Sequence, residues 1–336
     1  MTLSLAVVGA GFMGGLHART VAGGDAAELG AIVDVNETAG RKAADTYGAR
    51  WYRTVEDALA DSSIDAYIVA LPDRLHVEAT ATLLKAGKPV LLEKPLAHSL
   101  EGARTIAAAA REGSARLLVG HLLRFDPRYA QAAAAFRSGS AGDAVVVKAG
   151  RFAVRDIGVR TNGTSSVCFY LGVHDVDALQ WITGSRITRV YSRAVSRLMP
   201  SLGVASEDAI LSVVDFEDGF CGQVFNGWVR PERSPFHIDG RFELIGTEGT
   251  IEIDVRDHGL QINSNDGFTL PDGNHWPEVN GIVRGDLAAE IRHFCRAVRE
   301  DTDFVISVQE AMAAVAVNDA ILRSVESGLP EDVEAP

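Results

Sequence analysis

The sequence predicts an α/β domain with a parallel sheet, followed by an α+β domain with a large, mostly antiparallel sheet. Three observations support this fold class. Short apolar runs alternate with helical patterns up to about residue 120, a glycine-rich turn follows the first run, and longer β runs dominate the second half. The length of 336 residues suits two domains. We place them at residues 1–122 and 123–336, and we allow the C-terminal helix to pack back on the first domain.

The first domain is predicted from its apolar runs and the alanine-rich helices between them. Gly87 and Gly113 stop two of these helices, as glycines beyond a helix C-terminus do. Strand–helix alternation of this kind favours a parallel sheet with helices on both faces. The predicted strands are Leu3–Val8, Glu28–Val33, Ala66–Ala70, Pro89–Leu92 and Arg116–Val119, and the predicted helices are Glu37–Tyr47, Val55–Ala60, Leu75–Ala86 and Leu100–Glu112.

The pattern of predicted helices and strands changes at the start of the second domain. A helix at Pro127–Arg137 leads into a strand at Ala144–Phe152, and a loop separates that strand from a helix near Phe169–Ile182. Asp218-Gly219 is a hairpin signal between two β runs. We expect residues 331–336 to fray. The remaining predicted strands are Ile187–Ser196, Asp208–Phe216, Phe220–Phe225, Phe236–Ile245 and Thr250–Val255, and the closing helices are Asp286–Arg299 and Ser307–Ser327.

The composition of the chain argues against two classes of binding partner. The net charge of −13 argues against nucleic acid and against an anionic membrane surface. No apolar run is long enough to span a bilayer, and the N-terminus lacks the basic region of a signal peptide, so we expect a cytoplasmic protein. The three cysteines are odd in number and widely spaced, which favours reduced thiols over a disulfide framework or a zinc site. We expect no metal.

A dinucleotide-binding turn is predicted at Gly9-Ala10-Gly11-Phe12-Met13-Gly14, which follows the first strand and opens a helix. Gly9 allows the tight turn, Gly11 lets a pyrophosphate approach the backbone, and Gly14 permits close packing of helix on strand. The N–H groups at the helix start, where Phe12 and Met13 lie, bind the phosphates. The alternative is a glycine-rich turn without a ligand.

Asp34 ends the second strand about 20 residues beyond Gly14, where an acidic side chain accepts from ribose hydroxyls. A carboxylate repels a 2′-phosphate, and the next arginine is Arg41. We therefore expect NAD rather than NADP. The alternative is that Asp34 only starts a turn.

Two further segments follow predicted strands at the same edge of the sheet. Leu71-Pro72-Asp73-Arg74-Leu75-His76 should cross the nicotinamide side, with His76 near the cofactor but not catalytic. Glu93-Lys94-Pro95 ends the strand Pro89–Leu92, so Glu93 and Lys94 should lie beside the cofactor. Lysine is the cation whose pKa shifts readily on desolvation. The alternative is a surface lysine after a core strand.

Candidate substrate residues lie near the domain crossing and beyond it. Gly120-His121-Leu122-Leu123-Arg124-Phe125 can line a cleft, although we favour a packing role for His121 and a structural ion pair for Arg124. Tyr170, His174, Asp177 and Trp181 share a helix face by their spacing. His174 suits a general base near neutrality, and the alternative is a histidine with a purely structural role.

Three arginines precede that helix at Arg151, Arg155 and Arg160. Such a cluster in an acidic protein would suit an anionic substrate such as a sugar acid or phosphate. We favour the alternative of ion pairs to nearby carboxylates or a subunit contact.

Four motifs occur in a fixed order: the Gly9-to-Gly14 turn, Glu93-Lys94-Pro95, Gly120-His121-x-x-Arg124-Phe125 and Gly172-x-His174-x-x-Asp177. Together they resemble the glucose–fructose oxidoreductase/inositol dehydrogenase/rhizopine catabolism family (Gfo/Idh/MocA) along the whole chain. The segments 246–253 and 290–294 resemble that family's second-domain strand pair and penultimate helix. The resemblance implies a Rossmann domain, NAD(P) and oxidation of a hydroxyl on a sugar, inositol or derivative. It also implies a homo-dimer or homo-tetramer.

The same resemblance implies roles for individual residues. Lys94 would bond the reacting hydroxyl, Pro95 would follow a cis peptide bond, and His174 would transfer the proton. Tyr170 departs from the family, because many members carry an aspartate four residues before the histidine. Asp175 or Asp177 could supply the missing charge, Lys94 could take more of the proton transfer, or the substrate could differ. Two other functions stay open: an NAD-retaining glycoside hydrolase or lyase, and a non-catalytic NAD-sensing regulator.

Overall fold

The computed structural model describes residues 2–265 and 267–336. The chain folds into two compact units. Unit 1 contains Met1–Phe125 and Asn274–Met312, and unit 2 contains Asp126–Gly273 and Ala313–Pro336. The boundaries 1–122 and 123–336 remain a prediction for the functional domains, but the penultimate helix and the hairpin before it fold with unit 1.

Unit 1 is built on six parallel strands in the order β3-β2-β1-β4-β5-β6. This confirms the predicted Rossmann sheet. The short β3 was not predicted, because three residues carry too little pattern to separate a strand from a loop. The strands are β1 (Leu3–Val8), β2 (Ala27–Val33), β3 (Arg50–Tyr52), β4 (Ala66–Val69), β5 (Val90–Glu93) and β6 (Leu117–Gly120).

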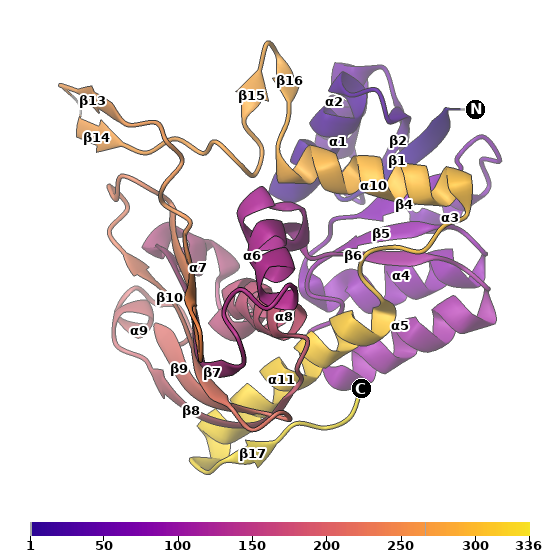
Figure 1. Ribbon diagram of the computed structural model, residues 1–336. Coiled ribbons are helices and arrows are strands. Elements are labelled where there is room, and N and C mark those ends of the chain that lie inside the picture. Colours follow the sequence, from indigo (N-terminus) through magenta and orange to yellow (C-terminus); the bar gives the residue numbers. More distant parts are fainter. Residues whose placement is uncertain (1, 266) are drawn as a thin grey trace. The chain divides into compact units, whose positions relative to one another are not determined.

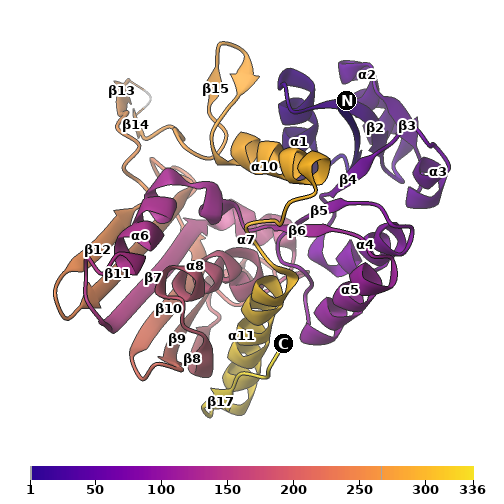
Figure 2. The same cartoon turned by 45° about the vertical axis from the view of Figure 1, so that its right-hand side comes forward.

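Helices cover both faces of this sheet, as parallel strands require. Helices α3, α4 and α5 pack on one face, and α1, α2 and α10 on the other (Figures 1 and 2). Asn36 and Ser99 cap α2 and α5 by accepting backbone N–H groups, as their sequence positions before the helices favour. The helices are α1 (Phe12–Gly23), α2 (Glu37–Tyr47), α3 (Val55–Leu59), α4 (His76–Lys85), α5 (Leu100–Glu112) and α10 (Asp286–Glu300), with short turns η1 (Asp73–Leu75) and η2 (Leu122–Phe125).

Unit 2 is built on seven strands in the order β12-β11-β7-β10-β9-β8-β17. Each neighbouring pair is antiparallel except β7 with β10, which confirms the predicted mostly antiparallel sheet. The strands are β7 (Ala144–Val154), β8 (Ile187–Val195), β9 (Ala209–Phe216), β10 (Cys221–Arg230), β11 (Ile238–Gly246), β12 (Thr250–Asp254) and β17 (Glu331–Asp332).

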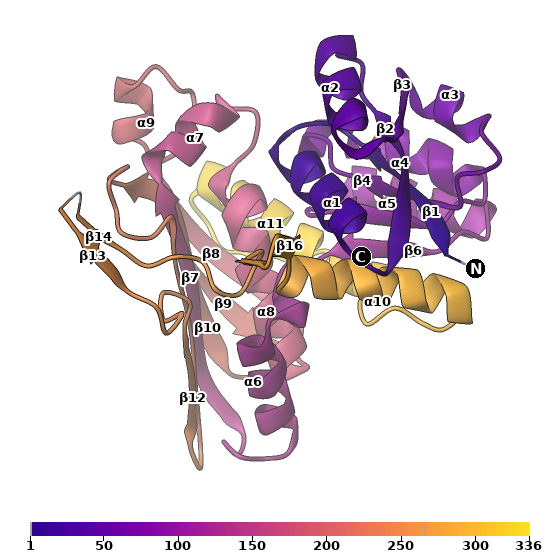
Figure 3. The same ribbon diagram turned by 90° about the horizontal axis from the view of Figure 1, so that it is seen from above.

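One face of this sheet carries the core of unit 2. Helices α6 (Pro127–Arg137), α8 (Val173–Thr183) and α11 (Val308–Ser327) lie along it (Figure 3). Residues on β8 and β9 alternate between buried and exposed, as a half-covered sheet requires. Among the described helices, none combines the length and apolar composition needed to cross a membrane.

The structure differs from the expectation at four local features. The loop predicted before α8 contains a helix, α7 (Arg155–Thr161), and a further short helix, α9 (Leu198–Ser201), follows β8. A π-helical turn, η3 (Cys168–Gly172), precedes α8. The tail expected to fray pairs with β8 through β17. Two small hairpins complete the chain, β13–β14 (Ile262–Ser264, Gly267–Thr269) and β15–β16 (Glu278–Val279, Ile282–Val283).

Candidate active site

The dinucleotide turn has the geometry that its glycines predict. Gly9 has a φ of 102° and donates to the Val33 carbonyl at 2.8 Å. A Cβ on Gly14 would lie 1.9 Å from the Gly9 oxygen, whereas a Cβ position on Gly11 has no atom within 4 Å. Helix α1 begins at Phe12 without a side-chain cap. Its first N–H groups can therefore bind a pyrophosphate, and these residues fit the predicted cofactor.

Asp34 lies directly beside this turn at the end of β2. Its Oδ2 accepts the Ala10 N–H and its Oδ1 accepts the Asn36 N–H, both at 2.7 Å. These bonds fix the carboxylate, and each oxygen keeps a lone pair that a ribose hydroxyl can use. The placement agrees with the ribose-binding role expected for Asp34.

His76 joins the Leu71 turn to Pro95. Its Nδ1 lies 2.8 Å from the Pro95 oxygen and its Nε2 lies 2.9 Å from the Leu71 oxygen. Burial lowers the pKa of His76, while the two carbonyl oxygens act in the opposite direction. The Lys94–Pro95 peptide bond is cis, as the resemblance implied. His76 therefore connects the Leu71-Pro72 turn to the Lys94-Pro95 segment through these two contacts.

Glu93 is the last residue of β5 and is buried. Its Oε1 accepts a hydrogen bond from Nε2 of His17, on α1, at 2.8 Å. Burial opposes the charge of Glu93, but the His17 hydrogen bond and the charge of Lys94 leave its pKa below the ordinary value. Helix α1, which begins at the dinucleotide turn, is thus hydrogen-bonded to Glu93, the residue before Lys94.

A second carboxyl group, that of Glu290 on α10, is buried beneath the same strand ends. Its Oε1 lies 3.6 Å from the Cβ position of Gly120, which is the register partner of Glu93. That oxygen has no hydrogen-bond partner among the described residues. Burial raises the pKa of Glu290 well above its ordinary value, and the charges of Glu93 and Asp286 add to the effect. Glu290 therefore favours its protonated form.

The predicted residues at the end of β6 are buried within unit 1. His121 is 1% exposed. Arg124 donates to Glu310 Oε1 at 2.6 Å and to the Val305 carbonyl at 3.2 Å, which is the structural pairing that we favoured for it. Burial opposes the charge of Glu310, but Arg124 leaves its pKa lowered.

The candidate residues of unit 2 lie on the π-turn η3 and on α8. Tyr170 is in the π-turn, 37% exposed, with its ring 6.1 Å from that of Trp228. His174 is in the first turn of α8. A Cβ on Gly172 would lie 2.5 Å from Asn226 Oδ1, so glycine is required between the two site residues. The π-turn changes the i,i+4 alignment expected for Tyr170 and His174, and such turns are frequent at functional sites.

Asp175 faces away from solvent and is held by two partners. Its Oδ1 lies 3.3 Å from Arg151 Nη2, and its Oδ2 accepts from Asn226 Nδ2 at 2.7 Å. Burial raises the pKa of Asp175, and Arg151 opposes that shift. Arg151 is thus part of a structural ion pair, which is the interpretation that we favoured for the arginine cluster.

The other two arginines of that cluster lie on α7. Arg160 pairs with Asp156 at 3.0 Å on the surface. Arg155 is the first residue of α7, and its Nε is buried without a hydrogen-bond partner among the described residues. Arg155 is therefore the member of the cluster whose substrate role remains a prediction.

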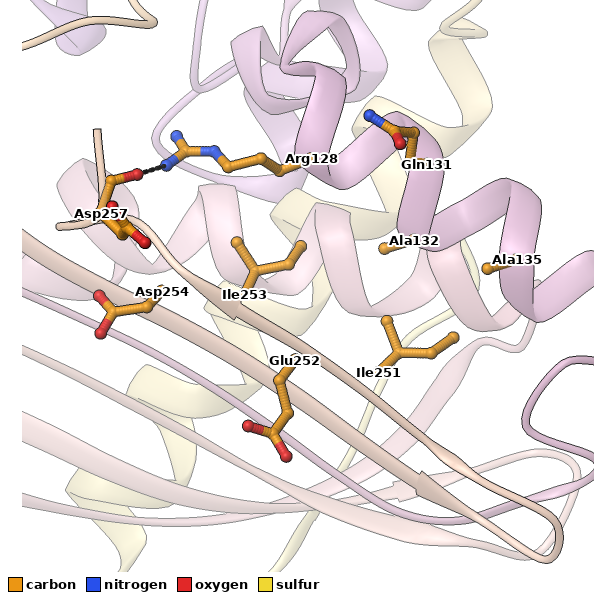
Figure 4. A pocket seen from close by; sticks show the side chains of 9 residues that line it. All are labelled: Arg128, Gln131, Ala132, Ala135, Ile251, Glu252, Ile253, Asp254 and Asp257. Carbon is orange, nitrogen blue, oxygen red and sulfur yellow. Dashed lines mark hydrogen bonds between the residues drawn. The ribbon is translucent and has the colours of Figure 1, made fainter. Parts of the chain in front are cut away.

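Unit 2 also has a surface pocket of about 440 Å³ between α6 and the edge strand β12 (Figure 4). Ile251 and Ile253 point toward α6, and Glu252 points away from it. None of the predicted site residues is among its described lining residues, so the pocket carries no argument for catalysis. It is lined by Arg128, Gln131, Ala132, Ala135, Ile251, Glu252, Ile253, Asp254 and Asp257.

Sequence reasoning missed three buried polar residues that lie beside segments of the predicted site. His17, Asn226 and Glu290 each contact a site segment that is distant in the sequence. The available signal was a polar residue on the buried side of a helix or strand, which requires a partner. The sequence did not show which partner it would be.

Two family models match the chain. One, described as an oxidoreductase family with an NAD-binding Rossmann fold, matches residues 3–121. The other, described as the GFO/IDH/MocA C-terminal domain, matches residues 129–252. The first model lies within predicted domain 1–122 and the second covers part of predicted domain 123–336. The models confirm the predicted cofactor, NAD, and the predicted enzyme class, an oxidoreductase.

Individual relatives match along almost the whole chain. Inositol 2-dehydrogenases 1 and 2 of Saccharopolyspora erythraea are 30% and 32% identical, each over 99% of this chain and over 97% and 96% of their own lengths. The crystal structure of GenD2 from gentamicin A biosynthesis, in complex with NAD, is similar with a TM-score of 0.88 and 28% identity, over 99% of this chain and 97% of that one. The two family models and the full-length relatives agree, and the chain belongs to the Gfo/Idh/MocA family of NAD-binding oxidoreductases.

Proposed function

We propose that this protein is an NAD-dependent dehydrogenase that oxidises a secondary hydroxyl of an inositol, sugar or sugar derivative. The observation that carries the proposal is the placement of Lys94 directly after β5, in the sheet whose first strand ends at the dinucleotide turn. Open α/β sheets bind ligands at the carboxyl ends of their strands. The names of two full-length relatives, both inositol 2-dehydrogenases, support the substrate class.

The reaction requires a donor for the hydroxyl oxygen and an acceptor for its proton. Lys94 donates a hydrogen bond to the oxygen and stabilises the negative charge that develops there. His174 accepts the proton as general base. Bound NAD would supply the redox chemistry, with C4 of its nicotinamide accepting the hydride from the carbinol carbon.

Tyr170 stands where many family members carry an aspartate, and this affects how much Lys94 and His174 each contribute to catalysis. A phenol stabilises an imidazolium less well than the aspartate that many family members carry at this position. The nearby Asp175 is held by Arg151 and Asn226 inside unit 2, so its charge is already paired. We therefore propose that stabilisation of the developing negative charge by Lys94 contributes more to the rate than proton acceptance by His174. Loss of turnover in Lys94→Ala should exceed that in His174→Ala.

The test is a screen of inositols, neutral sugars and acidic sugars with NAD, with NADH absorbance as the signal. Acidic sugars are included because of Arg155. Lys94→Ala should lower kcat on the order of a hundredfold or more, since it removes a charge-stabilising donor. NADH affinity should stay within about twofold, because binding rests on the turn at Gly9 and on Asp34. Lys85→Ala is the matched control, as Lys85 is a surface lysine on α4 paired with Glu112.

Each outcome of this screen decides between functions. NADH formation that depends on Lys94 supports the proposal. Consumption of a glycoside without net NADH would instead indicate an NAD-retaining hydrolase or lyase. NADH binding without turnover of any compound would indicate a regulator and overturn the dehydrogenase.

A further inference from the structure

A strap, defined here as residues 274–285, precedes α10 in unit 1. Its base is closed by the Asp286 N–H, which donates to the Asn274 carbonyl at 2.9 Å. Gly285 has a φ of 82°, and a Cβ there would lie 2.1 Å from the Asn274 oxygen. The β15–β16 hairpin forms the body of the strap. The strap is therefore a closed, hydrogen-bonded loop.

The strap rests on α1, the helix that opens at the dinucleotide turn (Figure 1). Glu278 forms an ion pair with Arg19 of α1, and Val283 is 3% exposed. At the start of α1 the rings of Trp276 and Phe12 meet edge to face, with centroids 6.3 Å apart and an interplanar angle of 77°. These contacts bring an aromatic side chain from a distant segment to the first residue of the helix.

Phe12 lies at the point where a bound dinucleotide is expected, which relates its contact with Trp276 to cofactor binding. Phe12 is the first residue of α1 and is 67% exposed. No side chain caps the helix start, and the Cβ position of Gly11 opens on free space. The pyrophosphate of a bound dinucleotide takes the N–H groups at this point. A large, exposed phenyl ring beside an anion site is costly in water unless a further surface covers it.

We propose that Trp276 is a cofactor-binding residue and that the strap is a clasp over the pyrophosphate portion of NAD. The indole offers a wide apolar face and one N–H donor. The indole meets the Phe12 ring edge to face and, together with that ring, would exclude water from the phosphates, which strengthens their bonds to the helix N–H groups. The N–H can donate to a phosphate oxygen. The inference rests on NAD binding and not on which hydroxyl compound is oxidised.

The first measurement is the affinity for NADH, by its fluorescence, and its dissociation rate, by stopped-flow displacement. Trp276→Ala should raise both the Kd and the dissociation rate roughly three- to tenfold, the range expected for loss of one aromatic contact. Trp276→Phe keeps a ring against Phe12 and should lie between wild type and the alanine variant. Energy transfer from tryptophan to bound NADH should fall in both variants.

The second measurement locates the contact along the cofactor. The effect of Trp276→Ala should be equally large for ADP-ribose, which has the pyrophosphate, and should disappear for AMP, which lacks it. A double-mutant cycle with Phe12→Ala should be strongly non-additive, because the two rings act together. Phe268→Ala is the control: it removes an exposed aromatic from the β13–β14 hairpin of unit 2 and should leave NADH affinity unchanged.

Two results would overturn the clasp. One is NADH affinity and dissociation within twofold of wild type in both Trp276 variants. The other is an equal loss of affinity for AMP and NADH, which would mean that Trp276 only supports the fold of the nucleotide-binding unit.

Discussion

At the scale of single residues, Glu290 makes a prediction about stability against pH. Its folded pKa lies well above the ordinary value of 4.5, because it is buried and near Glu93 and Asp286. In the window between 4.5 and the folded pKa, the unfolded chain releases a proton that the native chain keeps. The raised pKa of Glu290 therefore stabilises the native chain fully at pH values below the unfolded pKa. This stabilisation is lost as pH rises toward the folded pKa, at up to ~1.4 kcal/mol per pH unit.

Glu290→Gln removes this titration and keeps a neutral group of similar shape. The free energy of unfolding of the variant, minus that of wild type, should therefore rise with pH above the unfolded pKa of 4.5 in denaturant titrations. Glu112→Gln, on the surface of α5, is the control and should give a difference that is constant with pH. A constant difference for Glu290→Gln as well would show that Glu290 is ionised in the native chain.

Asp34 makes a prediction about cofactor choice. Its carboxylate accepts the Ala10 and Asn36 N–H groups, so a variant should keep the side-chain shape. Asp34→Asn removes the charge that repels a 2′-phosphate, and the ratio of kcat/KM for NADP over NAD should rise roughly tenfold, equivalent to ~1.4 kcal/mol. Asp65→Asn serves as the control, because Asp65 bonds Ser4 at the other end of β1. An unchanged ratio would mean that Asp34 does not discriminate between a ribose 2′-hydroxyl and a 2′-phosphate.

Residue-scale prediction succeeded where a residue's neighbours in sequence determine its place. Lys94 and Asp34 follow apolar runs, and the end of a buried strand is visible in the sequence. His17 and Trp276 could not be assigned, because their partners are Glu93, 76 residues away, and Phe12, which comes from the other end of the chain. Their contacts depend on tertiary packing, which a single sequence does not display.

At the scale of elements, the boundaries of long helices could be predicted and the irregular turns could not. Helices at Glu37–Tyr47, Leu100–Glu112 and Pro127–Arg137 match the structure, since capping residues and glycines mark their ends. The π-turn η3 and the helix α7 carry no such marks. A π-turn inserts one residue into a helical pattern, and an amphipathic pattern of this length hides the insertion.

The π-turn predicts the effect of filling the space beside it. Gly172→Ala would bring a Cβ within 2.5 Å of Asn226 Oδ1, and Asn226 is fixed by its bond to Asp175. We expect a loss of ~1–3 kcal/mol in the free energy of unfolding, as for overpacking of a core. Gly23→Ala is the control, because that helical glycine has no atom within 4 Å of its Cβ position. Equal stability of the two variants would show that Asn226 moves aside freely.

At the scale of the whole molecule, the order of apolar runs along the chain predicted the two main sheets. Alternating apolar runs specify a parallel sheet, and long alternating β runs specify a half-covered one. The packing of residues 274–312 with unit 1 could not be predicted, because α10 is amphipathic and its pattern does not name the sheet that it covers.

Assembly is the last property that the sheet of unit 2 predicts. Its outer face exposes four large apolar side chains on β8 and β9, namely Tyr191, Val195, Leu211 and Val213. Tyr191 and Val213 are register partners on this face. Exposed apolar side chains such as these would suit the homo-dimer or homo-tetramer that the resemblance implies, which stays a prediction. Leu211→Arg with Val213→Glu should therefore reduce the mass in light scattering after gel filtration, without loss of the folded state. Val305→Glu, an exposed apolar residue of unit 1, is the control and should leave the mass unchanged. A wild-type chain that is monomeric at micromolar concentration would refute the expected assembly, because apolar contacts of this kind persist at such concentrations in stable dimers.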